Sequence, residues 1–143
     1  MGNPFLRRVQ SGFGSLIAHY GFRVVADSYN ADNFGNAMVI LEASNIRVRV
    51  LTDRGDVFVD VAGRLSPNDW HMLQRALQAI TGRRDPSEGP LNLEEAAKLL
   101  DQNMALLDEG FTSECFADTK RRLDNLDALA RSRLLQHLQR REN

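Results

Sequence analysis

Three consecutive runs of β-forming residues constrain this chain most, because together they determine their own strand register. The runs are residues 37–43, 46–52 and 57–62. The turn-like pairs Ser44-Asn45 and Arg54-Gly55 separate them, which is typical of two tight hairpins. Two-residue connections at these pairs set Leu41 opposite Val48 and Val48 opposite Val61. The sequence therefore predicts an antiparallel meander with one apolar face rich in valine.

The same register pairs opposite charges on the other face of the predicted sheet. Glu42 falls beside Arg47, and Arg49 falls beside Asp60. A slip of one residue would place these charges in the apolar layer, so both hairpins agree on a single register. We expect the apolar face to be covered by helices and the charged face to be open to another macromolecule.

Apolar residues at three- and four-residue spacing predict helices on both sides of the meander. The predicted helices are residues 5–20, 66–82, 92–109 and 113–140, and residues 22–29 form a further strand. Ser66 is expected to cap the second helix, and Trp70 to belong to its buried stripe. The predicted fold is a single α+β domain over residues 1–143: an N-terminal helix, a four-stranded antiparallel meander and three C-terminal helices packed on one sheet face. The last helix can protrude or mediate assembly.

Composition limits the classes of partner. A formal net charge of −1 argues against a dedicated nucleic-acid binder, which usually has a strong basic excess. No apolar run reaches the roughly 20 residues that span a bilayer, and we find no secretion signal. The single cysteine, Cys115, cannot form an internal disulfide. These features predict a cytoplasmic protein that does not bind membranes.

No cofactor or catalytic constellation is evident in the sequence. The histidines, His19, His71 and His137, fall on three different predicted helices without a second ligand at metal-binding spacing. Cys115 lies near the start of the last helix, where the helix dipole lowers a thiol pKa, but the sequence assigns it no histidine partner. We therefore predict no cofactor, no metal and no catalytic residue.

The acidic residues of the second hairpin give the one alternative of enzymatic type. Asp53, Asp56 and Asp60 together could form a metal site of nuclease type, although the predicted sheet has no lysine to complete one. The favoured interpretation is structural, since aspartate and glycine are common turn residues and Asp60 faces Arg49.

Candidate partner-binding residues lie on the charged face and at the loop tips. Phe34 beside Gly35 either folds back as a core plug or stays exposed as an anchor. The predicted set is Phe34, Glu42, Arg47, Arg49, Asp53, Arg54, Asp56, Phe58 and Asp60.

The chain resembles a group of small bacterial cytoplasmic proteins, some of which are immunity proteins of polymorphic toxin systems. The resemblance is carried by residues 34–41 and 47–60, by Trp70, and by the Tyr20-Gly21-Phe22 turn after the first helix. It covers roughly residues 15–110 and implies a non-enzymatic, antitoxin-like or accessory binding role. Because its motifs are turn and core signatures, it implies no functional residues.

Three functional hypotheses follow. The first is a non-enzymatic binding protein, of immunity or antitoxin type, that occludes a partner protein such as a toxin. The second is an oligomeric accessory protein, for example a phage-defence or phage component, that assembles through the C-terminal helix. The third is a metal-dependent enzyme using Asp53, Asp56 and Asp60.

Overall fold

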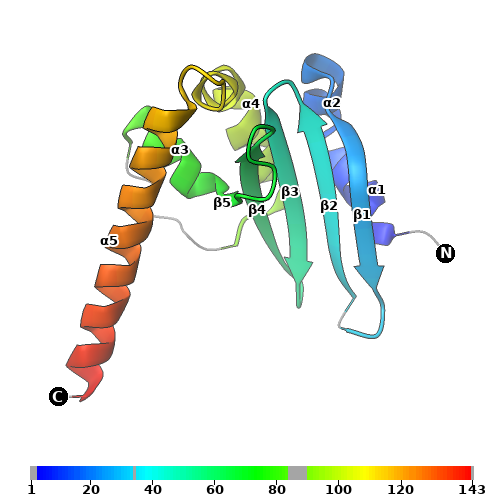
Figure 1. Cartoon of the computed structure of the whole chain (residues 1–143). Coiled ribbons are helices and arrows are strands. Elements are labelled where there is room, and N and C mark those ends of the chain that lie inside the picture. The colour runs from blue at the N-terminus through cyan, green and yellow to red at the C-terminus, as the bar shows by residue number, and fades with distance from the viewer. Residues whose placement is uncertain (1–2, 34, 84–89, 143) are drawn as a thin grey trace.

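The computed structural model describes residues 3–33, 35–83 and 90–142, and this part of the chain forms an α+β fold (Figure 1). Two short helices precede the sheet: α1 (Pro4–Gly12) and α2 (Gly14–Tyr20). The strands are β1 (Arg23–Asn30), β2 (Asn36–Ala43), β3 (Ile46–Asp53), β4 (Asp56–Gly63) and β5 (His71–Met72). The helices that follow are α3 (Leu73–Thr81), α4 (Leu93–Gly110) and α5 (Phe116–Glu142).

The five strands form one antiparallel sheet in the order β1-β2-β3-β4-β5. The predicted register is confirmed: Leu41 pairs with Val48, and Val48 pairs with Val61. The strand count is corrected from four to five, because residues 71–72 pair with β4. At the second hairpin, Arg54 and Gly55 both have positive φ, which matches the twist that a two-residue turn requires.

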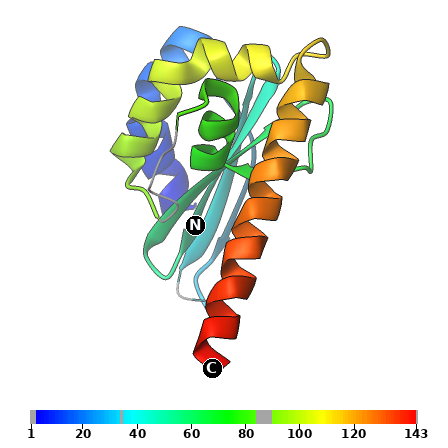
Figure 2. The same cartoon turned by 90° about the vertical axis from the view of Figure 1, so that its left-hand side faces the viewer.

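The valine-rich face of the sheet forms the core. Val39, Val50 and Val61 have no accessible surface. Full burial of a valine side chain stabilises a fold by about 1.5 to 3 kcal/mol, so this layer is a major source of stability. Helices α1 and α4 lie behind this face of the sheet, and their buried residues belong to the same hydrophobic cluster (Figures 1 and 2).

The predicted packing of three C-terminal helices on one sheet face is corrected, because α5 packs mainly on α3. Leu123 is fully buried, and the Arg122 guanidinium donates to the Ala79 carbonyl at 3.2 Å. The Thr119 hydroxyl donates to the Gly110 carbonyl at 2.7 Å, which joins α5 to the end of α4. The C-terminal half of α5 then projects beyond α3 (Figures 1 and 2).

Residues 66–72 differ most from the prediction, since α3 begins at Leu73 and not at Ser66. The Ser66 amide donates to the Gly63 carbonyl and the Asp69 amide to the Ser66 carbonyl, so this segment forms turns. The chain then runs extended through β5. Trp70 consequently lies outside the helix and does not contribute to its buried stripe.

Two other helix boundaries also move. The predicted first helix breaks at Phe13, whose side chain is buried, and restarts at Gly14 as α2. The last helix begins at Phe116 and not at residue 113, because residues 111–115 form turns in which the amides of Cys115 and Phe116 donate to the Thr112 carbonyl.

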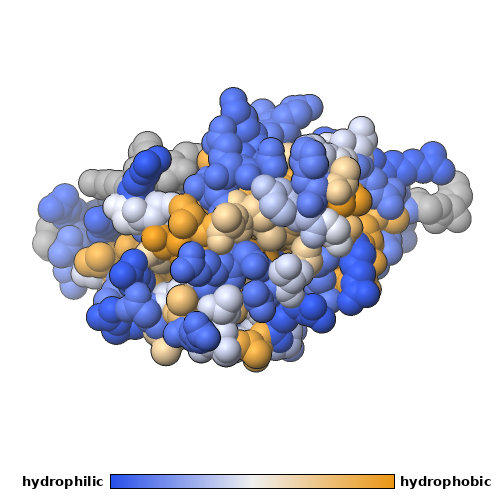
Figure 3. Space-filling model, turned by 90° about the horizontal axis from the view of Figure 1, so that it is seen from above, coloured by the Kyte–Doolittle hydropathy of each residue, from blue (hydrophilic) through white to orange (hydrophobic). Residues whose placement is uncertain are grey.

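None of the helices in the described ranges has both the length and the apolarity needed to cross a bilayer. Viewed from above, a band of hydrophobic residues crosses this end of the molecule between hydrophilic side chains (Figure 3).

The end of β4 provides a test of the packing. A Cβ added at Gly63 would lie 2.9 Å from Cδ1 of Phe111, a fully buried ring. We expect Gly63→Ala to lower the free energy of unfolding by about 1 to 3 kcal/mol, because the ring has no space to retreat. Gly14→Ala is the matched control: its added Cβ meets nothing within 4 Å and should leave stability unchanged or raised. Urea titrations of both variants measure the difference, and equal stabilities would contradict the packing.

Candidate functional site

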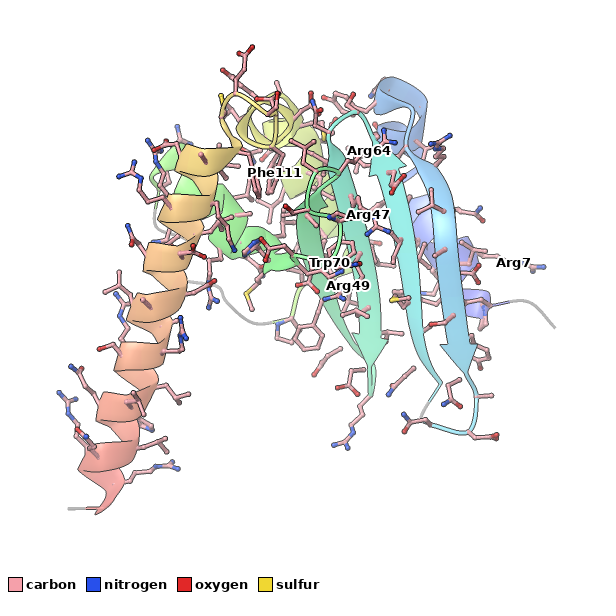
Figure 4. The ribbon with its side chains drawn as sticks, viewed as in Figure 1. Arg7, Arg47, Arg49, Arg64, Trp70 and Phe111 are labelled. Carbon is pink, nitrogen blue, oxygen red and sulfur yellow. The ribbon has the colours of Figure 1, made fainter. Side chains whose placement is uncertain are left out.

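The outer face of the sheet carries an aromatic ring stacked on two arginines. The guanidinium carbons of Arg47 and Arg49 lie 5.1 Å and 4.5 Å from the centroid of the Trp70 ring (Figure 4). Arg47 Nε lies 2.8 Å from Glu42 Oε2, and an Arg49 terminal nitrogen lies 2.7 Å from Asp60 Oδ2. We call these five residues the Trp70 platform.

The platform is built from two distant segments of the chain. Strands β2, β3 and β4 position the charged residues through the pairs Glu42–Arg47 and Arg49–Asp60, as predicted. Trp70 comes from the connection between β4 and β5, which is also held by a hydrogen bond from Arg47 to the Pro67 carbonyl. The predicted open face is therefore partly covered at this point.

The electrostatics of the platform favour a rigid arrangement. The charged side chains are only 15 to 26% exposed, and each arginine has a carboxylate partner. Two cations over one indole ring add attraction that is stronger when the groups are partly desolvated. The platform is thus neutral overall and fixed before any partner arrives.

Two hollows lie near the platform: Trp70 itself lines one, and the other begins two residues farther along β3 and β4 on the same face of the sheet. The strand-end hollow, about 490 Å³, has an apolar floor where Met38, Leu51 and Phe58 lie side by side across β2, β3 and β4. The α5 cleft, about 440 Å³, lies between the start of α3 and the middle of α5. Trp70 lines the α5 cleft together with Met72, Asp127 and Leu134, among others.

A third hollow, about 690 Å³, lies on the other side of the molecule between α1, the β3–β4 hairpin and the start of α4. Its charged lining is balanced, with Arg7 and Arg8 against Asp56 and Glu94. It contains none of the platform residues. The labelled Arg7 points away from the body of the protein (Figure 4).

The acidic residues of the second hairpin are not gathered in one place. Asp53 pairs with Asp56 at the hairpin end, and its carboxylate accepts a hydrogen bond from Asn36 at 3.3 Å. Asp60 lies four residues farther along β4 than Asp56, about 13 Å at the usual strand rise, and pairs with Arg49. Within residues 3–33, 35–83 and 90–142, no three His, Cys, Asp or Glu side chains are placed to hold one metal ion.

The remaining predicted site residues have separate positions. Arg54 is at the tip of the second hairpin, where its backbone amide donates to the Asn36 side chain at 3.0 Å. Phe58 lines the strand-end hollow. Phe34 lies outside the described residues.

A charged cluster ties α5 to the segment that carries Trp70. Lys120 Nζ lies 2.9 Å from Asp69 Oδ2, and His71 Nε2 lies 3.1 Å from the same oxygen. Burial acts to raise the pKa of Asp69, but the contacts with Lys120 and His71 outweigh it and hold that pKa below its ordinary value. The hydrogen bond to Asp69 raises the pKa of Lys120. Arg75 on α3 pairs with Asp127 on α5 at 2.9 Å, which adds a second tie.

Sequence reasoning missed Trp70 and the α5 cleft. The signal that could have found Trp70 is the run of turn-forming residues Pro67, Asn68 and Asp69 just before it, which competes with the helix-start signal at Ser66. The α5 cleft joins residues more than fifty positions apart, and no local pattern indicates that contact.

Comparisons of the chain with models of protein families, with curated proteins and with solved structures find no match. The resemblance to immunity proteins therefore stays a prediction.

The Asp69 cluster makes the stability of the fold depend on pH in a defined direction. A carboxylate with a lowered folded-state pKa contributes stability above its unfolded pKa, near 4, and loses it as pH falls through the folded value. Lys120, whose folded-state pKa is raised, contributes stability below its unfolded pKa, near 10. It loses this stability as pH rises through the folded-state pKa. Asp69→Asn should therefore destabilise the fold by under about 1 kcal/mol, for so exposed a pair, between about pH 7 and pH 9, and this difference should shrink as pH falls toward 2.

Thermal melts of wild type and Asp69→Asn across this pH range measure the effect. Asp32→Asn, in the exposed β1–β2 loop, is the control and should match wild type. A difference between wild type and Asp69→Asn that stays constant as pH falls through 4 to about 2 would contradict the assigned role.

Proposed function

We propose that this chain is a non-enzymatic binding protein whose outer sheet surface binds and occludes a partner protein. The Trp70 platform is the observation that carries this proposal. Tryptophan and arginine are the residues most enriched among those that dominate binding energy at protein interfaces. Here one tryptophan and two arginines adjoin on a single surface, with hollows on either side.

Pre-organisation supports the platform as the centre of an interface. The arginines are already held by Glu42 and Asp60, so a partner would not have to immobilise them. Each rotamer-rich side chain that is ordered on binding costs about 0.5 to 1.5 kcal/mol, and a fixed platform avoids much of that cost.

The strand-end hollow supplies the apolar component of the surface. Met38, Leu51 and Phe58 offer a shallow floor for an apolar side chain of the partner. Asp53 at its rim and Arg49 on the platform give charges of both signs, which favour one orientation of the partner over others.

The resemblance to immunity proteins suggests the class of partner. A cytoplasmic antitoxin acts by covering the active surface of a toxin, which requires a rigid complementary surface and no chemistry of its own. We therefore propose a toxin as the partner. The alternative, an oligomeric accessory protein such as a phage-defence component, is favoured by one observation: the exposed leucines of α5.

Co-expression with a toxin encoded next to this gene tests the proposal. We expect the wild-type chain to restore growth and to co-purify with the toxin. Trp70→Ala and Phe58→Ser should each weaken the complex about 30-fold or more, since central aromatic residues at an interface commonly contribute 2 kcal/mol or more.

Leu106→Ser is the matched control. Leu106 is an exposed leucine on α4 and belongs to neither the platform nor the hollows, so this variant should protect as well as wild type. Circular dichroism melts establish that each variant is folded. Failure of wild type to protect or to co-purify would refute the toxin as partner, and full protection by folded Trp70→Ala would refute the platform as the interface.

A further inference from the structure

The C-terminal half of α5 exposes large apolar side chains that the protomer itself does not cover. Leu129, Leu134, Leu135 and Leu138 are 52, 58, 60 and 47% exposed. Most of the other exposed large hydrophobic side chains of the described residues lie singly on separate elements. Four such side chains on one half of a single helix exceed the scattered single apolar residues of an ordinary surface.

Two of the exposed leucines, Leu134 and Leu138, continue the stripe by which α5 packs on α3. Thr119 and Leu123 are buried, Leu126 is half-buried, and Ala130, Leu134 and Leu138 follow at four-residue steps. Side chains at such steps lie on one face of a helix. The packing face of α5 therefore extends past the start of α3 into the α5 cleft, which Ala130 and Leu134 line.

We infer that this face pairs antiparallel with α5 of a second copy of the chain, about a two-fold axis at Leu134. Four positions on each side of the axis, Ala130 then lies opposite Leu138 of the second copy. Seven positions away, Asp127 lies opposite Arg141 of the second copy. The interface is isologous, so every contact occurs twice.

The charges along α5 select the antiparallel arrangement. Asp124 and Asp127 lie on the side of Leu134 toward the N-terminus, while Arg140 and Arg141 lie on the other side. Arg131 and Arg133 lie between these groups on each helix, so antiparallel pairing brings Asp127 of one helix to Arg141 of the other at both ends of the overlap. Parallel pairing would align the arginines of both helices, and like charges at this distance repel.

The α5 cleft completes the interface. In the antiparallel arrangement, the end of the second α5 runs toward Trp70 and Met72, which line this cleft. The overlapping helices are about 20 Å long, which is short for a stable dimer, so the contact with the cleft adds area that the helix pair alone lacks. The Asp127 carboxylate, paired with Arg75, lies at the cleft and offers its other lone pairs to Arg141 of the second copy.

This inference does not depend on the proposed toxin. The dimer uses α5, whereas the partner surface is centred on the outer sheet face. The mass of the chain alone tests the dimer, while growth and co-purification test the toxin complex, so the two proposals can fail separately.

Light scattering on the full chain after gel filtration gives the first test. We expect a mass of about 32 kDa, twice the 16.1 kDa of one chain. Leu134→Asp combined with Leu138→Asp should raise the dissociation constant of the dimer about 100-fold or more, because four carboxylates then meet in an apolar contact. These side chains are exposed in the protomer, so the melt of a dilute, monomeric sample should stay as in wild type. Leu106→Asp on α4 is the control and should remain dimeric.

Disulfide cross-linking tests the register. In a Cys115→Ser background, Leu134→Cys should cross-link to itself across the two-fold axis. Leu138→Cys should not cross-link alone but should do so when mixed with Ala130→Cys. Self-cross-linking of both Leu134→Cys and Leu138→Cys would indicate parallel helices and overturn the antiparallel arrangement. Self-cross-linking of Leu138→Cys alone would overturn the register, since it places the axis at residue 138.

Three outcomes would overturn the second copy as the occupant. One is a wild-type monomer at the highest soluble concentration. Another is a monomer that floats with phosphatidylglycerol vesicles, when the Leu134→Asp, Leu138→Asp variant does not bind them. That result would assign the leucines to an anionic lipid surface. The third is a monomeric wild type that binds the toxin, when the Leu134→Asp, Leu138→Asp variant does not. That result would assign this face of α5 to the toxin.

Discussion

The alternation of valine with charged residues along β2, β3 and β4 is the constraint on which the rest of the structure depends. Because neighbouring side chains of a strand point to opposite faces, burial of Val48 and Val50 forces Arg47 and Arg49 to the outer face. The cross-strand register then supplies each arginine with a carboxylate. Two paired arginines side by side form a surface on which one indole ring can lie, and Trp70 occupies it.

The sheet could be predicted from sequence because the forces that determine it are local. Each hairpin joins adjacent strands through two residues, so residues 36–53 contain both partners of one hairpin and residues 46–63 both partners of the other. The start of α3 could not be predicted in this way. Ser66 and Pro67 do match a helix start, but the stacking of Trp70 on Arg47 and Arg49 and the pairing of β5 with β4 favour an extended chain there. Both competing contacts are tertiary.

The same distinction applies to the candidate site. Glu42, Arg47, Arg49 and Asp60 followed from the register, since their partners are neighbours in a hairpin. Trp70 could not be assigned to them, because nothing in the sequence indicates how residues 64–70 fold back over the sheet. The path of α5 could not be predicted from the sequence either. It depends on the hydrogen bond from Thr119 to the end of α4 and on the ion pair between Arg75 and Asp127 across the cleft.

The position of Trp70 has a consequence for how the two proposed surfaces would influence each other. The Trp70 ring belongs to the Trp70 platform and also lines the α5 cleft. Its neighbour Asp69 forms an ion pair with Lys120 on α5. A second copy in the cleft would also restrict the β4–β5 connection, and so reduce whatever ordering cost remains for a partner on the platform. By linkage, that partner would tighten the dimer by the same factor. If both occupants instead need the same face of the indole, each would lower the affinity of the other by the same factor. The sign of the coupling between dimer formation and partner binding therefore shows whether the two occupants share or compete for the ring.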